Sequence, residues 1–268
     1  MRQKFRPIQN SLDCIGDINA IKTMAKAKAK AICFDLDGTI LFNFCTPLEN
    51  ENIIETLYSF TEIGYEVVIN SARTLEKMVQ MLPILKKIYS KIVIIADSGK
   101  EIVVHGKRDL DWALYFDSIP KINSNNLEFV TNMLKRHSIP FHLTNHVNDV
   151  YANIKVETPI SLVIESDINK ALYFKGLFVK SGYDNLKIVS SLVNKGTAYM
   201  WWKQHRGIIA FDIGIGNSVL DKLFIDCCRC KYLINYKCKR NLNGYMFIDI
   251  NNYNDLQHFL KDLLDSYR

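Results

Sequence analysis

The sequence lacks long apolar runs and shows no secretory signal pattern. Among its 268 residues, the longest apolar stretches are strand-sized, as in residues 92–96, and far too short to cross a membrane. No apolar signal-peptide core opens the chain, and Asp13 and Asp17 argue against an organelle-targeting segment. We therefore expect no membrane partner, and we expect residues 1–30 to form a helical N-terminal extension.

A disulfide framework is also missing. The seven cysteines are an odd number without paired spacing, which favours reduced thiols and a cytoplasmic protein. Cys227 and Cys230 form a single C-x-x-C step, and no second pair or suitably spaced histidines accompany it. A structural zinc site needs such a second pair. We interpret these cysteines as small buried apolar residues.

No nucleic-acid-binding motif accompanies the net charge of +6, and neither a repeat nor an extended low-complexity tract occurs. Basic residues concentrate between Lys222 and Arg240, opposed in that segment only by Asp226. Such a segment is usually a solvated surface, although it also suits an anionic substrate. We expect no nucleic-acid partner, and nothing in the pattern indicates an oligomeric state.

The first third of the chain alternates between apolar strand patterns and helical patterns. Strands are expected at residues 31–34, 66–70 and 92–96, with helices from Thr46 to Gly64 and over residues 74–82. Strand–helix–strand alternation is typical of a parallel sheet with right-handed crossovers. The sequence therefore predicts an α/β protein with a Rossmann-like parallel sheet.

This alternation changes after the polar turn at residues 97–101, and an α/β insert large enough for a small domain follows. Within the insert we expect helices at 125–137 and 167–181 and strands at 150–156, 160–164 and 186–189. The core pattern resumes with a helix from Lys195, a strand at 207–213, a helix through Leu223, strands at 232–234 and 245–248, and a C-terminal amphipathic helix. The predicted division is a core of residues 31–105 and 191–268 with a cap domain of residues 106–190.

Two carboxylates, Asp35 and Asp37, follow the first strand and precede Gly38 and Thr39. Alternate strand residues point to the same side, so both carboxylates are expected at the carboxyl end of that strand, where open α/β sheets bind ligands. Crowded carboxylates call for a cation, and Mg²⁺ accepts few carboxylates together with phosphate oxygens. One could act as a nucleophile and the other as a general acid and base. The alternative is an acidic turn.

Further polar residues stand at predicted strand ends and helix starts. Ser71 and Arg73 follow the second strand, where a hydroxyl and a guanidinium suit a phosphoryl group. Lys195 begins a helix, which is unfavourable for a cation unless an anion lies nearby. Asn217 and Asp221 follow a glycine-containing loop and could supply oxygens to a metal. Each alone is equally well explained as a helix cap or a solvated side chain.

In order, these motifs resemble those of the haloacid dehalogenase superfamily of phosphatases. The first motif is residues 35–39 (DLDGT), the second 67–73 (VVINSAR), the third 194–198 (NKGTA) and the fourth 214–221 (GIGNSVLD). The position of the insert is similar to that in the subfamily with a large α/β cap between the second and third motifs. Within that subfamily, the motifs resemble those of mannosyl-3-phosphoglycerate and sucrose-phosphate phosphatases. Asn217 stands where these relatives have an aspartate.

The resemblance implies a Mg²⁺-dependent phosphatase that hydrolyses a small phosphorylated metabolite, such as a sugar phosphate, through an aspartyl-phosphate. Asp35 would be the nucleophile, Asp37 the general acid and base, and Lys195 the catalytic cation. The implied substrate-binding residues are Gly38, Thr39, Ser71, Ala72 and Arg73, and the implied metal-binding residues are Asp35, Asp37, Asn217 and Asp221.

Two alternatives stay open. A phosphomutase on the same fold would keep the phosphoryl group on its substrate. A non-catalytic ligand-binding relative is suggested by Asn217, which offers a metal an oxygen but no negative charge.

Overall fold

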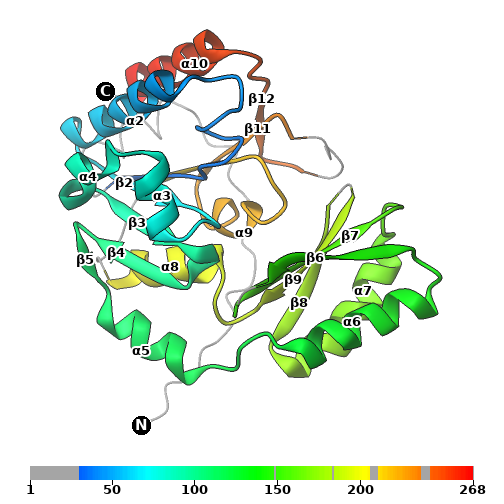
Figure 1. Cartoon of the computed structure of the whole chain (residues 1–268). Helices are drawn as coiled ribbons and strands as arrows, with labels where there is room; N and C mark the ends of the chain where they lie inside the picture. Colours follow the sequence, from blue (N-terminus) through cyan, green and yellow to red (C-terminus); the bar gives the residue numbers. More distant parts are fainter. Residues whose placement is uncertain (1–29, 148, 183, 206–210, 237–241, 268) are drawn as a thin grey trace.

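The computed structural model describes residues 30–147, 149–182, 184–205, 211–236 and 242–267, and we restrict structural statements to them. The helical extension expected over most of residues 1–30 lies outside these ranges. Two sheets are seen, a large one of eight strands and a smaller one of four. The first belongs to a Rossmann-like core and the second to an inserted α/β cap (Figure 1).

The large sheet has the strand order β12-β11-β10-β1-β2-β3-β4-β5. Its strands are β1 (Lys30–Phe34), β2 (Tyr65–Asn70), β3 (Val93–Ala96), β4 (Glu101–Val104), β5 (Lys107–Arg108), β10 (Phe211–Gly216), β11 (Cys230–Ile234) and β12 (Met246–Ile248). The six strands from β12 to β3 run parallel, whereas β4 and β5 are antiparallel additions at one edge. This arrangement confirms the predicted fold class.

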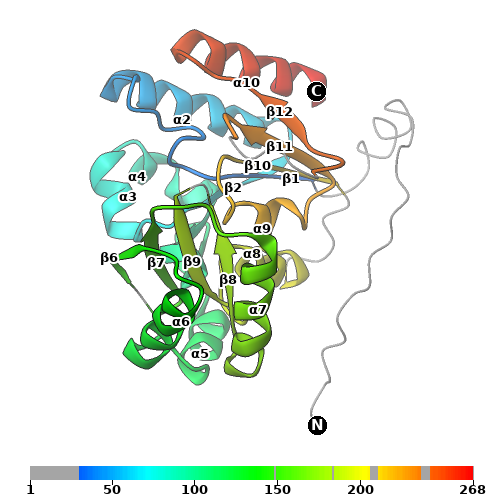
Figure 2. The same ribbon diagram turned by 90° about the vertical axis from the view of Figure 1, so that its right-hand side faces the viewer.

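Helices cover both faces of this sheet (Figure 2). The helices of the core are α2 (Pro47–Glu62), α3 (Leu75–Met81), α4 (Leu85–Ile88), α5 (Leu110–Ser118), α8 (Lys195–His205), α9 (Lys222–Ile225) and α10 (Tyr253–Tyr267), with 3-10 turns η1 (Tyr89–Lys91) and η2 (Asp97–Gly99). Strand β1 serves both faces, because Ile32 and Phe34 pack toward α2 and α10 while Ala31 and Cys33 pack toward α5, α8 and α9. The central strand is therefore apolar throughout, as a strand buried on both faces must be.

Local sequence explains where the first long helix begins and ends. Thr46 caps α2 in a capping box, since its hydroxyl accepts a hydrogen bond from the amide of Glu49 while the Glu49 carboxylate accepts one from the amide of Thr46. Pro47 occupies the first turn, where its missing amide hydrogen costs nothing. The chain then leaves the helix at Ile63 and enters β2.

The cap sheet is antiparallel, with the order β6-β7-β9-β8. Its strands are β6 (Phe141–Val147), β7 (Tyr151–Val156), β8 (Leu177–Ser181) and β9 (Asn185–Ser190), and its helices are α6 (Ser124–Arg136) and α7 (Leu162–Leu172), followed by a 3-10 turn, η3 (Tyr173–Lys175). Both helices pack on the same face of the sheet, where they bury a separate apolar cluster.

Two of the expected cap elements are wrong. Residues 160–164 were expected to form a strand, yet Ser161 caps α7 by accepting a hydrogen bond from the amide of Ile164, and Leu162 is exposed. The helix expected over 167–181 stops at Leu172, because Gly176 adopts a left-handed conformation and β8 begins after it. Apolar side chains at a helix start resemble a strand pattern, which explains the first error.

Elements β4, β5, α5 and β6 were not anticipated from the sequence. Strand β5 pairs with β4 in the large sheet, and Trp112 and Phe116 of α5 pack in a core cluster with Val68 and Ile95. We propose that the division into core and cap be kept, with the start of the cap drawn after α5.

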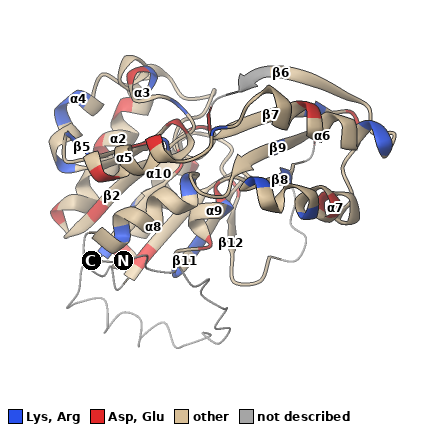
Figure 3. Cartoon of the chain, turned by 90° about the horizontal axis from the view of Figure 1, so that it is seen from below, with Lys and Arg blue, Asp and Glu red and all other residues tan. Residues whose placement is uncertain are grey.

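Charges of both signs are interspersed over the core and the cap in the view of Figure 3. In the basic segment, the ammonium groups of Lys222 and Lys231 lie over the Tyr245 ring, and Lys231 also pairs with Asp226. Within the described part of the chain, no helix has the length and apolar character needed to span a membrane.

Candidate active site

The first-, second- and fourth-motif segments follow strands β1, β2 and β10, which are neighbours in the sheet. Because these strands are parallel, their carboxyl ends meet at one edge, and the chain turns there into Asp35, Ser71 and Asn217. The third motif reaches the same edge on helix α8. The topology therefore brings segments from the first and last thirds of the chain to one edge of the sheet.

The centre of this edge is a lysine held between two carboxylates. Lys195 Nζ donates to Oδ1 of Asp35 at 2.5 Å and to Oδ1 of Asp221 at 2.6 Å. All three residues are buried, with exposures of 5% or less. Oδ2 of Asp35 accepts a hydrogen bond from the Thr39 hydroxyl, and Oδ2 of Asp221 accepts from the amides of Asn217 and Ser218. The anion expected near Lys195 is thus a pair of carboxylates.

One ammonium cannot fully offset two buried carboxylates, and their pKa values separate. Burial, and then repulsion from Asp221, raises the pKa of Asp35 to about 7, although Lys195 opposes this shift. Burial would also raise the pKa of Asp221, but Lys195 and the donors around Ser218 outweigh it and lower that pKa. Burial would lower the pKa of Lys195, yet the carboxylates of Asp221 and Asp35 raise it. Asp221 is therefore the more firmly ionised carboxylate, and Asp35 is the one that gains from a further cation.

Asp37 takes a different partner from Asp35. Arg73 Nε donates to Oδ2 of Asp37 at 2.8 Å, and Arg73 Nη2 donates to Oδ1 at 2.7 Å. Both side chains are partly exposed, whereas Asp35 is buried. Strand alternation does not extend to Asp37, since β1 ends at Phe34 and Asp37 instead forms an isolated bridge with Leu41.

Gly38 and Asn217 lie in direct contact across the site. Gly38 has a φ of +72°, and a Cβ atom added there would lie 2.1 Å from the side-chain nitrogen of Asn217. A larger residue at position 38 would therefore suffer both backbone strain and a clash. The contact brings the Asn217 amide beside the loop of the first motif, next to Asp37.

The second motif contributes one buried and two more accessible residues. Ser71 is fully buried, and its hydroxyl oxygen accepts a hydrogen bond from the amide of Arg73 at 3.1 Å. Ala72 is exposed, and Arg73 is partly exposed. Thr39, expected to bind substrate, is buried with its hydroxyl committed to Asp35. The substrate-binding roles of these residues remain a prediction.

Three residues that position Lys195 lie within the second and third motifs, but the sequence analysis assigned them no role. Asn70 donates from Nδ2 to the carbonyl of Lys195 at 3.0 Å. Asn194 caps α8, since its Oδ1 accepts from the amides of Gly196 and Thr197. A Cβ on Gly196 would lie 2.3 Å from the carbonyl oxygen of Leu223, so glycine lets α8 approach α9 beside Asp221. An asparagine directly before a helix was a usable capping signal.

The donor chemistry at this edge suits a magnesium ion. Among the described residues, no three acidic, histidine or cysteine side chains form a metal-binding group. Magnesium nevertheless is commonly bound by one or two carboxylates, with water and substrate phosphate completing its shell. Asp35, the Asp37 carbonyl, Asn217 and Asp221 offer carboxylate, carbonyl and amide oxygens of that kind, and the two carboxylates are buried around a single ammonium group. The residues present therefore fit this ion.

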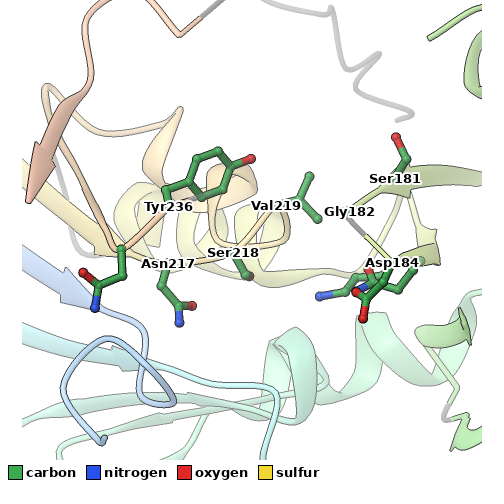
Figure 4. Close-up of a pocket in the computed structure, with 10 residues that line it drawn as sticks. Ser181, Gly182, Asp184, Asn217, Ser218, Val219 and Tyr236 are labelled. Carbon is green, nitrogen blue, oxygen red and sulfur yellow. The ribbon is translucent and has the colours of Figure 1, made fainter. Parts of the chain in front are cut away.

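A pocket of about 280 Å³ adjoins this site between core and cap. Figure 4 shows Asn217, Ser218, Val219 and Tyr236 on the core side, with Ser181, Gly182 and Asp184 of the cap across from them. The lining also includes Asn185, Lys187 and Asn235. Polar amides, hydroxyls and one aromatic ring predominate, so the pocket can form many hydrogen bonds with a small polar molecule.

Other candidate groups lie away from this edge. Asp212 accepts hydrogen bonds from Tyr199 Oη, Lys203 Nζ and the amide of Arg229, which directs its carboxylate into the core. Within the described ranges, Cys33, Cys45, Cys227, Cys228 and Cys230 are free thiols. Burial raises the pKa of the Cys227 thiol to about 11, so this side chain is protonated at neutral pH.

Solved structures with the same fold include several phosphatases. A sucrose-phosphatase from Synechocystis, solved with sucrose and phosphate, aligns with a TM-score of 0.60 and 12% identity, over 89% of this chain and 98% of its own. Trehalose-6-phosphate phosphatase from Aspergillus fumigatus has a TM-score of 0.56 and 14% identity, over 93% and 98%. A haloacid dehalogenase-like hydrolase from B. subtilis has a TM-score of 0.55 and 16% identity, over 87% and 99%.

No curated protein sequence matches the chain. Comparison with protein families gives one match, to haloacid dehalogenase-like hydrolases, over residues 32–170. This segment is more than half of the chain, and it contains the first two motifs and most of the cap. The protein belongs to the family of haloacid dehalogenase-like hydrolases.

Proposed function

We propose that the protein is a Mg²⁺-dependent phosphatase that hydrolyses a small phosphorylated metabolite, most readily a sugar phosphate, through an aspartyl-phosphate. The observation that carries this proposal is the buried Lys195 between Asp35 and Asp221, at the sheet edge beside a polar pocket. The phosphatase neighbours named above support the reaction class, and the polar lining of the pocket supports a hydroxyl-rich leaving group.

In the first step, an Asp35 oxygen attacks phosphorus and the bond to the leaving oxygen breaks. Asp37 gives that oxygen a proton, so the leaving group departs as a neutral alcohol. In the second step, water attacks phosphorus, Asp37 takes its proton, and Asp35 is released with inorganic phosphate. Lys195 orients Asp35 and offsets charge on the phosphoryl oxygens throughout.

For these two reaction steps to occur, Arg73 has to release Asp37 and bind the substrate instead. Its guanidinium binds both oxygens of Asp37, so neither carboxylate oxygen can meet a leaving group while this pair is intact. A phosphoryl group offers Arg73 the same bidentate geometry. We propose that substrate draws Arg73 away and leaves Asp37 free to carry a proton.

The metal would be held by Asp35, the Asp37 carbonyl, Asn217 and Asp221. Such an ion supplies positive charge to the phosphoryl oxygens and to the nucleophile. Asp35 gains most, since its pKa is raised to about 7 by burial and by Asp221. The part of the cap that lines the pocket would exclude bulk water during the reaction.

The test is release of inorganic phosphate from p-nitrophenyl phosphate and a panel of sugar phosphates, with and without Mg²⁺. We expect Asp35→Asn to abolish release, while Asp262→Asn, which changes an exposed carboxylate on α10 outside the pocket lining, retains it. Turnover by Asp35→Asn equal to that of the unmodified protein would remove Asp35 as the nucleophile. An isomerised sugar phosphate would instead indicate a phosphomutase. Absence of both Mg²⁺ binding and phosphate release would indicate a non-catalytic relative.

A further inference from the structure

One face of the cap sheet is covered by helices, and the opposite face carries polar side chains. Leu186 and Ile188 of β9 pack in the apolar cluster beneath α6 and α7. Lys187 lies between them in sequence, so its side chain points to the opposite face. It lines the pocket together with Asn217 and Ser218 of the core. A cap lysine therefore faces the candidate active site.

The strand register places two further polar residues beside Lys187 on the cap sheet. Lys187 pairs with Asn153 of β7 on one side and with Lys180 of β8 on the other. Directly paired residues of antiparallel strands share a face, so the side chains of Lys180 and Lys187 leave the sheet on the same side, and the charge of Lys180 acts on Lys222 of the core. Like charges in this relationship destabilise a sheet unless an anion lies near them. The Oδ1 atom of Asn153 is also buried, with no hydrogen-bond partner among the described atoms.

The charges around Lys187 do not neutralise it. It forms no salt bridge with any carboxylate in the described ranges; the carboxylates that act on it from a distance are Asp221, Asp35 and Asp184. Lys195 already binds the first two, and Oδ1 of Asp184 accepts from Asn185. Burial lowers the pKa of Lys187, and the Lys195 ammonium acts in the same direction. An ammonium that has lost hydration beside a cavity is stabilised most by an anionic ligand.

We propose that Lys187 selects phosphate monoesters whose leaving group carries a second anionic group, such as a carboxylate. The selection rests on the phosphatase function proposed above, because the phosphoryl group is assumed to lie at Asp35. The pocket volume of about 280 Å³ restricts the leaving group to a small metabolite. A neutral leaving group of the same size would occupy the pocket and leave the Lys187 ammonium without a counter-ion.

Two matched probes isolate the second anionic group. 6-Phosphogluconate and glucitol 6-phosphate differ only at one end, where a carboxylate replaces a hydroxymethyl group. Their affinities are measured by calorimetry on the full-length Asp35→Asn chain in Mg²⁺-containing buffer, so that binding is read without turnover. We expect the acid to bind about tenfold more tightly, as one charge-assisted hydrogen bond implies.

Adding Lys187→Gln should bring this ratio close to one and leave the affinity for glucitol 6-phosphate little changed. Lys187→Arg should keep most of the preference, since the charge is retained. The matched control is Lys135→Gln, an exposed lysine on α6 beyond the helix-covered face of the cap sheet. Thermal unfolding of each variant verifies that it is folded.

A ratio of one or less without the Lys187 substitution overturns the proposal, as does an unchanged ratio in Lys187→Gln. Failure of both probes to bind at millimolar concentration overturns it as well. The phosphatase function is judged separately, by phosphate release from p-nitrophenyl phosphate by the chain that retains Asp35. Because the calorimetric comparison needs no turnover, the two proposals can fail independently.

Discussion

Arg73 forms a bidentate pair with Asp37, with Nε and Nη2 donating to the two carboxylate oxygens at 2.8 and 2.7 Å. The pair joins the loop of the first motif to that of the second, at the mouth of the site. It keeps Asp37 apart from the buried Asp35, which is bound to Lys195 instead. The two aspartates of the first motif are therefore in different electrostatic environments, as two groups with different chemical roles require.

Replacement of Arg73 tests whether its guanidinium group binds the phosphoryl group of the substrate through two hydrogen bonds. We expect Arg73→Ala to lower kcat/KM for p-nitrophenyl phosphate by about 10- to 100-fold, the effect of losing charged hydrogen bonds. Arg73→Lys should recover only part of this loss, because a lysine keeps the charge but not the bidentate geometry. Arg108→Ala is the control, since Arg108 is exposed in β5 at the sheet edge. Full activity in Arg73→Lys would rule out bidentate recognition.

Substitutions of Lys195 and Lys203, which lie on the same helix, distinguish a loss of catalysis from a loss of stability. We expect Lys195→Met to reduce turnover by about 100-fold or more, since loss of one preorganised donor costs ~3 kcal/mol in the transition state. Lys203→Met removes the partner of Asp212, away from the site, so thermal stability should fall while kcat is retained in the folded protein. Steady-state kinetics and thermal unfolding of both variants measure kcat and the melting temperature. Equal kcat losses would contradict the assignment of Lys195.

The pKa of Asp35 predicts a pH-dependent stability in the absence of metal. Burial and Asp221 raise this pKa from 3.8 to about 7, so the folded state binds the proton more tightly than the unfolded chain. The stabilising contribution of the protonated group is complete below pH 4 and is lost as pH rises toward 7. Asp35→Asn should therefore raise the melting temperature by several degrees at pH 8 and by much less at pH 5. Metal-free thermal unfolding at both pH values measures this, and a difference independent of pH would contradict it.

Position 217 tests the metal site without relying on activity. Asn217 contacts Gly38 of the first motif, and its side-chain amide would offer a bound metal an oxygen without negative charge. Asn217→Asp should tighten Mg²⁺ binding by roughly tenfold, because added ligand charge strengthens binding of hard cations. The control is Asn185→Asp, which adds the same charge on the cap side of the pocket lining. Calorimetric titration with Mg²⁺ gives both affinities; equal gains would show a general charge effect rather than coordination at position 217.

Much of the core was predictable from local patterns, and the cap was less so. β2, β3 and α2 of the core, and α6 of the cap, lie within one or two residues of their expected bounds, because apolar periodicity agrees there with the helix start at Thr46 and the stop at Gly64. Residues 162–166 form the start of α7 and were misassigned, since the exposed Leu162 and Val163 imitate a strand, and the predicted helix was carried too far beyond Leu172. Apolar side chains that stay exposed carry the same sequence signal as buried ones.

The chain alone determined the α/β class and the four segments that carry the candidate chemistry, since strand-end polar residues and an apolar central strand are local features. Only the tertiary structure decided which cation each aspartate meets, that Lys195 joins Asp35 to Asp221, and that Lys187 faces the pocket. These relationships depend on strand order and on how the cap sheet is placed over the core. Contacts between residues that lie on different elements, 26 to 160 positions apart, are set by packing, and no local pattern specifies them.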